Sequence, residues 1–93
     1  MNDTIAIRPA ALNATLDLVT TTALVDVTRM DSTEGGVMAL SLRWPGISSG
    51  EKVLWQVVAW LNSQGPRPDD FTLRADLDDS NYAAVTRLLA EVA

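Results

Sequence analysis

Apolar residues recur at helical spacing along residues 48–63, the longest run of this kind in the chain. Positions three and four apart place Val53, Val57 and Trp60 on one face of a helix, while Lys52 falls on the opposite face. The pattern therefore predicts an amphipathic helix with a wide buried face over residues 48–63.

The ends of this helix are also indicated by the sequence. Ser48 is followed three residues later by Glu51, which is the spacing of a capping box, and Gly65 with Pro66 is expected to stop the helix. Trp55 falls beyond the edge of the apolar face, beside Ala59. We therefore expect Trp55 to lie on the side of the helix that faces away from the core.

Two segments are typical of strands. Residues 23–30 are rich in β-branched side chains, and residues 37–44 alternate apolar with polar positions up to Trp44. The loop between them, DSTEGG, is polar and carries two glycines that can supply positive φ. The two segments are predicted to form a β-hairpin.

Three further segments carry weaker patterns. Ile5 and Ile7 alternate as in a short strand that ends at Pro9. Residues 15–22 alternate in a β-like manner and fit either a strand or an irregular lead-in. Residues 71–77 also alternate and predict a short strand, with a turn of helix as the alternative.

A second amphipathic helix is expected near the end of the chain, at about residues 79–92. Asp78 is a good N-cap, Leu77 and Tyr82 have the spacing of a hydrophobic staple, and Arg87 is four residues from Glu91. The fold class predicted is α+β, with residues 1–93 forming a single domain. Its small antiparallel sheet consists of the hairpin 23–30/37–44 plus short strands, packed with helices at about 48–63 and 79–92.

Composition narrows the functional classes. The chain is 47% hydrophobic and 20% charged, as in folded domains, and its net charge of −5 disfavours nucleic acid and acidic membrane surfaces as partners. It has no cysteine and no histidine, which removes disulfides, thiol catalysis and the usual zinc ligands. No apolar run is long enough for a membrane span. We expect a cytoplasmic protein and, because so small a chain buries little surface, a homodimer.

Two patterns resemble catalytic or metal-binding motifs. Ser49 and Lys52 have the S-x-x-K spacing of serine acyl enzymes, but the accompanying motifs are missing and helix capping explains the same stretch. Five aspartates lie within residues 69–79, and Asp76, Asp78 and Ser80 have the spacing that opens a calcium loop. Asn81 and Arg87 stand where that loop needs glycine and glutamate. We predict no catalytic residue, no metal, no cofactor and no small-molecule substrate.

The remaining functional signal is aromatic. Trp55, with Ala59 beside it and Trp44 adjoining, is the predicted interaction surface, because tryptophan dominates binding hot spots. The leading hypothesis is a non-enzymatic protein-interaction module that binds a protein partner or itself. The alternatives are a nucleic-acid-associated regulator with a helix-turn-helix-like C-terminal half, and an acidic inhibitor that occupies a partner's nucleic-acid site.

One resemblance accompanies these patterns. The stretch SSGEKVL before a helix, followed by the ending DLDDSNYxxV, resembles small uncharacterised proteins of actinobacteria and their phages over about residues 47–90. These proteins carry no assigned activity, so the resemblance implies a source and no function.

Overall fold

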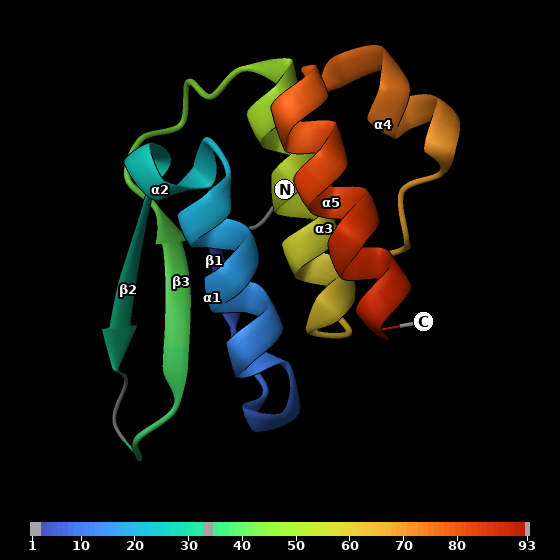
Figure 1. Cartoon of the computed structure of the whole chain (residues 1–93). Helices are drawn as coiled ribbons and strands as arrows, with labels where there is room; N and C mark the ends of the chain where they lie inside the picture. The colour runs from blue at the N-terminus through green and yellow to red at the C-terminus, as the bar shows by residue number, and fades with distance from the viewer. Residues whose placement is uncertain (1–2, 33–34, 93) are drawn as a thin grey trace.

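The computed structural model describes residues 3–32 and 35–92, which form a three-stranded antiparallel sheet and five α-helices (Figure 1). The predicted α+β class is confirmed. The elements in chain order are β1 (Thr4–Ala6), the 3-10 turn η1 (Pro9–Ala11), α1 (Leu12–Thr21), α2 (Leu24–Val27), β2 (Thr28–Ser32), β3 (Met38–Leu42), α3 (Ser49–Leu61), α4 (Asp70–Asp76) and α5 (Asp79–Val92).

The sheet has one apolar face and one polar face. β3 is the central strand, and its Leu40 stands between Ile5 of β1 and Met30 of β2. Ile5 and Leu40 are buried in the core, and Met30 is partly buried against it. The opposite face carries small and polar side chains, namely Thr4, Ala39, Ser41, Arg29 and Asp31. The alternation of side chains along each strand therefore places core residues on one face, while the opposite face carries the exposed Thr4, Arg29 and Asp31 beside the buried Ala39.

The helix α3 is the centre of the core. Leu54 and Val58 on this helix are fully buried, and α3 contacts α1, α2 and α4. The helix α1 contacts α5 as well as α3, so the long helices cover one another beside the sheet (Figure 1). The core thus has two parts, one between α3 and the sheet and one between α3 and the other helices.

Both predicted amphipathic helices are confirmed, together with their N-caps. The Ser48 hydroxyl accepts from the Glu51 N–H at 3.2 Å, and the Glu51 carboxylate accepts from the Ser48 N–H at 2.8 Å. Asp78 caps α5 by accepting from the Asn81 N–H at 2.8 Å. These local bonds satisfy donors that a helix leaves free at its first turn.

The end of α3 differs from the prediction. The helix stops at Leu61, before the expected Gly65, because Ser63 adopts a left-handed conformation with φ of 60°. The N–H of Gln64 then donates to the Ala59 carbonyl at 2.7 Å, and the Ser63 N–H donates to Trp60 at 3.1 Å. This is a Schellman motif in which serine takes the position that usually holds glycine.

The predicted hairpin is confirmed for β2 and β3, but its first strand begins later than expected. The strand prediction for residues 23–27 is wrong, because Leu24–Val27 form the single helical turn α2. Leu24 and Val27 are buried at helical spacing, and the Thr28 hydroxyl donates to the Leu24 carbonyl at 2.7 Å. Burial of this pair against α1 overrides the β propensity of the segment.

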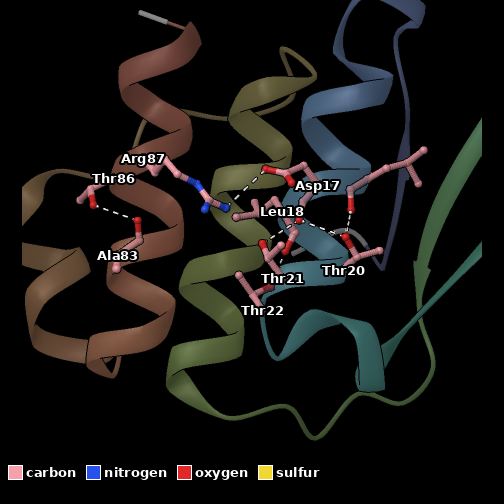
Figure 2. A network of polar contacts seen from close by, with 9 residues as sticks. Asp17, Leu18, Thr20, Thr21, Thr22, Ala83, Thr86 and Arg87 are labelled. Carbon is pink, nitrogen blue, oxygen red and sulfur yellow. Dashed lines mark hydrogen bonds and ion pairs between the residues drawn. The ribbon is translucent and has the colours of Figure 1, made fainter.

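The β-like interpretation of residues 15–22 is also wrong, because most of this segment lies in α1. Thr15, Leu18, Val19 and Thr22 are buried at helical spacing. Thr20, Thr21 and Thr22 each donate a side-chain hydroxyl to the carbonyl four residues earlier, at 2.7–2.9 Å (Figure 2). These bonds accommodate threonine in the helix. Because threonine usually prefers strands, its presence in the sequence does not indicate a helix here.

Residues 71–77 form no strand, and the alternative of a helical turn is what the structure contains. The helix α4 begins at the Asp69 N-cap, whose carboxylate accepts from the Thr72 N–H at 2.8 Å. Leu73 is buried, whereas Phe71 is 80% exposed. The apolar residues at alternating positions therefore lie on different sides of a helix and not on one face of a strand.

Candidate functional site

Trp55 does not lie on an exposed surface. Its side chain is 2% exposed and belongs to the core, so the expectation that it faces away from the core is wrong. The prediction assumed that α3 is covered on one side. In the structure Ile5 of β1 lines the same cavity as Trp55, together with residues of the segment that follows α3. Trp55 therefore packs within the chain itself.

A small cavity lies beside Trp55. We call it the Trp55 cavity, and its volume is about 180 Å³. It is lined by Ile5, Trp55, Gln56, Ala59, Gln64, Gly65 and Pro66. The walls come from β1, from α3 and from the segment that follows α3, so the cavity lies where these three parts of the chain meet.

Two glutamines and a glycine shape the cavity wall. The Gln64 side-chain amide donates to the Ala6 carbonyl of β1 at 3.0 Å, which fixes its orientation. A Cβ atom on Gly65 would stand 3.4 Å from the Ala59 Cβ, so the chain passes close to α3 at this point. Gln56 is the other polar group of a wall that is otherwise apolar. The cavity thus offers apolar contact with amide groups beside it.

The structure brings together two of the three predicted interaction residues. Trp55 and Ala59 both line the Trp55 cavity, but Trp44 lies after β3, is 46% exposed and does not line it. Ile5, Gln64 and Pro66 also line the cavity, and helical spacing gives no sign that they are neighbours of Trp55. Gly65 and Pro66 were interpreted only as a stop signal for α3, and periodicity carries no information on which strand covers a helix.

Three of the five aspartates in residues 69–79, namely Asp69, Asp70 and Asp78, accept hydrogen bonds from nearby residues. The Asp70 carboxylate accepts from the Arg74 Nε at 2.6 Å and from the Tyr82 hydroxyl at 2.7 Å, which joins α4 to α5. These two bonds, with that from Arg74 the stronger influence, hold the pKa of Asp70 below its usual value. The same carboxylate raises the pKa of Tyr82, and the N–H of Thr72 lowers the pKa of Asp69. Within residues 3–32 and 35–92, no group of three acidic side chains is placed to hold a metal ion.

Two charged side chains of the C-terminal helix α5 bear on the hypothesis of a nucleic-acid-associated regulator. The Arg87 guanidinium points toward Asp17 on α1, with 4.0 Å between the charged atoms (Figure 2). The predicted spacing partner Glu91 lies on the same helix, but the ion pair in the structure is with Asp17. Asp79 lies in the first turn of α5, where a reading helix would need positive or amide side chains.

Comparison with known proteins yields no matching family model, no similar curated protein and no similar solved structure. Across the described part of the chain, none of the helices combines the length and the apolar character that crossing a bilayer requires.

Proposed function

We propose that this chain is a non-enzymatic protein-interaction module that takes one apolar side chain of a protein partner into the Trp55 cavity. The observation that carries the proposal is the cavity itself, because its wall joins Trp55 and Ala59 to Ile5 and Pro66. The proposed role of Trp55 is thus to form the wall of a binding site. We further propose that the module works in the cytoplasm, for which a chain without cysteine is suited.

The volume of the cavity favours a side chain over a free small molecule. Pockets for small organic ligands typically measure about 300–1,000 Å³. The Trp55 cavity, at about 180 Å³, is closer to the engineered cavities of roughly 150 Å³ that hold a single benzene ring. A partner that inserts one leucine or phenylalanine would fill it, and anchors of this kind supply much of the energy of protein interfaces.

A cavity-filling substitution tests this proposal. Ala59→Leu adds a side chain that occupies the Trp55 cavity, and Ala59 is only partly buried, so the fold should tolerate it. The matched control is Ala83→Leu, which adds the same side chain on the exposed face of α5. Circular dichroism and thermal unfolding of both variants establish that each is folded before binding is measured.

The probe is a displayed library of random peptides, selected on the wild type. We expect the selected peptides to share one large apolar residue, and to bind Ala59→Leu about tenfold or more weakly than wild type and Ala83→Leu. Selected peptides that bind all three proteins equally would show that the cavity is not the binding site. Failure to select any peptide would also contradict the proposal.

A further inference from the structure

The outer edge of β2 is open to another strand. β2 is one of the two outer strands of the sheet and lies at the margin of the molecule, and in the described part of the chain no further element lies beyond it (Figure 1). Outer strands present a row of backbone donors and acceptors that can pair with another chain. The directions of the backbone groups of β2 decide which residues such a strand would meet.

The backbone N–H and C=O groups of Met30 point away from β3, toward the outer edge of the sheet. The Arg43 N–H donates to the Val27 carbonyl at 2.8 Å, so residue 27 directs its backbone groups toward β3. In an antiparallel ladder this direction alternates along the strand. The backbone groups of residues 29 and 31 therefore also point toward β3, while those of residues 28, 30 and 32 point outward. The Thr28 carbonyl already accepts from the Arg43 Nε at 3.1 Å. Within the described residues, the N–H and C=O of Met30 have no hydrogen-bond partner.

Opposite charges stand on either side of Met30. Arg29 and Asp31 lie on the polar face of the sheet and form an ion pair at 2.9 Å, with side chains that are 67% and 49% exposed. If a second copy adds its own β2 antiparallel with Met30 at the two-fold axis, Arg29 of each copy stands opposite Asp31 of the other. Side chains directly opposite each other in an antiparallel pair interact, and opposite charges there are favourable.

Neighbouring registers lack this match. A two-fold axis at position 29 would set two arginines opposite each other, and an axis at position 31 would set two aspartates opposite each other, which is unfavourable. The Met30 register also pairs outward-facing backbone groups with each other, so the two Met30 residues exchange N–H···O=C bonds. Hydrogen-bond direction permits the registers centred on positions 29, 30 and 31 alike, because each of them pairs outward-facing residues with each other. The charges therefore select the Met30 register among them.

We propose that the chain forms a homodimer in which β2 of one copy pairs antiparallel with β2 of a second copy, centred on Met30. The two three-stranded sheets join into one continuous sheet, and the interface is isologous, as two-fold dimers require. Backbone bonds supply the affinity and the Arg29–Asp31 pairs set the register. This interface is separate from the Trp55 cavity, so it goes beyond the proposed function.

Charge reversal provides the test, with sedimentation velocity on the full chain as the readout. Arg29→Asp puts two aspartates opposite each other at each site, and Asp31→Arg puts two arginines opposite each other. We expect each variant to raise the dimer dissociation constant about tenfold or more. The double variant R29D/D31R restores opposite charges in the Met30 register and is expected to dimerise like the wild type.

Mixing the two single variants is the most discriminating experiment. Arg29→Asp and Asp31→Arg each lack the ion pair within the chain, but together they place aspartate opposite arginine at both sites of a heterodimer. We expect the mixture to recover dimers. A control mixture of Lys52→Asp and Glu91→Arg carries the same two net charges away from β2 and should dimerise no better than the wild type alone.

The outcomes that would overturn the proposal are distinct. A wild type that stays monomeric at high concentration would mean that Arg29 and Asp31 protect the edge from pairing, as charges on edge strands do in other proteins. A dimer that survives both charge reversals, or a mixture that stays monomeric, would exclude the Met30 register. Because Ala59→Leu should leave the dimer intact, a failure here is distinguishable from a failure of the cavity as a binding site.

Discussion

The two outer strands of the sheet are treated differently by the rest of the chain. The edge of β1 is closed by the segment that follows α3. There the Gln64 amide donates to the Ala6 carbonyl at 3.0 Å, and the Asn62 side-chain oxygen accepts from the Arg8 N–H at 2.9 Å. The Arg8 guanidinium also donates to Ser63. At the edge of β2 the Arg43 Nε donates to the Thr28 carbonyl at 3.1 Å, but among the described residues no segment covers the outward-pointing backbone groups of Met30.

The difference shows that the chain covers the edge of β1 with its own segment and leaves the edge of β2 available for pairing. Closing the β1 edge requires Ser63 to adopt a left-handed backbone, which costs a non-glycine residue roughly 1–2 kcal/mol. The buried Asn62 amide offsets this cost, since it also donates to the Thr15 hydroxyl at 3.1 Å and to the Val58 carbonyl at 2.9 Å. Substitutions at the closed edge should therefore change stability, and substitutions at the open edge should change association.

The largest effect is expected beneath the closed edge, at Trp55. Trp55→Ala removes a fully buried aromatic side chain and should lower the free energy of unfolding by about 3–5 kcal/mol. The matched control is Trp44→Ala, which should cost about 1 kcal/mol or less because Trp44 is half exposed. Urea unfolding followed by circular dichroism measures both. Equal losses at the two tryptophans would contradict the burial of Trp55.

The next effect is expected at Asn62, which closes the edge. Asn62→Ala leaves the Arg8 N–H and the Thr15 hydroxyl without their partner, and should cost about 2–4 kcal/mol because both groups are then left unpaired. Asn13→Ala, on the exposed side of α1, is the control and should change stability by less than about 0.5 kcal/mol. If the two alanine variants unfold at the same urea concentration, the Asn62 bonds do not hold the edge.

A smaller effect is expected at Gln64. Gln64→Ala removes one hydrogen bond to the Ala6 carbonyl at the surface and should cost about 0.5–1 kcal/mol. It should also leave the oligomeric state unchanged, since the β1 edge takes no part in the proposed dimer. Thermal unfolding and sedimentation measure the two quantities. New association of this variant would show that an uncovered β1 edge pairs as readily as β2.

The smallest effect is expected from acid, and it should fall on α4 rather than on either edge. The pKa values of Asp69 and Asp70 are lowered in the folded chain, so their ionised forms favour folding above the usual aspartate pKa of about 4. That contribution is lost as the pH falls through the lowered values. Amide signals of α4 should weaken during acidification before those of α3. Simultaneous loss of both helices would contradict this order.

Local signals in the sequence were sufficient to predict about half of the fold. The capping box at Ser48 and the N-cap at Asp78 act over three residues, so the starts of α3 and α5 could be predicted. In α1, by contrast, buried Thr15 and Thr22 occupy core positions that a pattern of apolar residues does not count. The short helices α2, of four residues, and α4, of seven residues, depend on packing against other elements, which alternation along the chain does not reveal.

The candidate site was predictable only in part, for a related reason. Helical spacing placed Ala59 next to Trp55, and both line one cavity. The other walls come from Ile5, some fifty positions earlier in the chain, and from Pro66 after the helix, so their proximity arises only through tertiary packing. The same packing buries Trp55, whose exposure was inferred from one helix taken alone.

The most direct test of the contrast between the two edges is amide hydrogen exchange at Met30, measured by NMR at two protein concentrations. We predict that the Met30 N–H is protected at high concentration and exchanges freely on dilution. The Arg8 N–H, which bonds to Asn62, should be protected at both concentrations. A Met30 N–H that exchanges freely at both concentrations would contradict pairing of the β2 edge with a second copy.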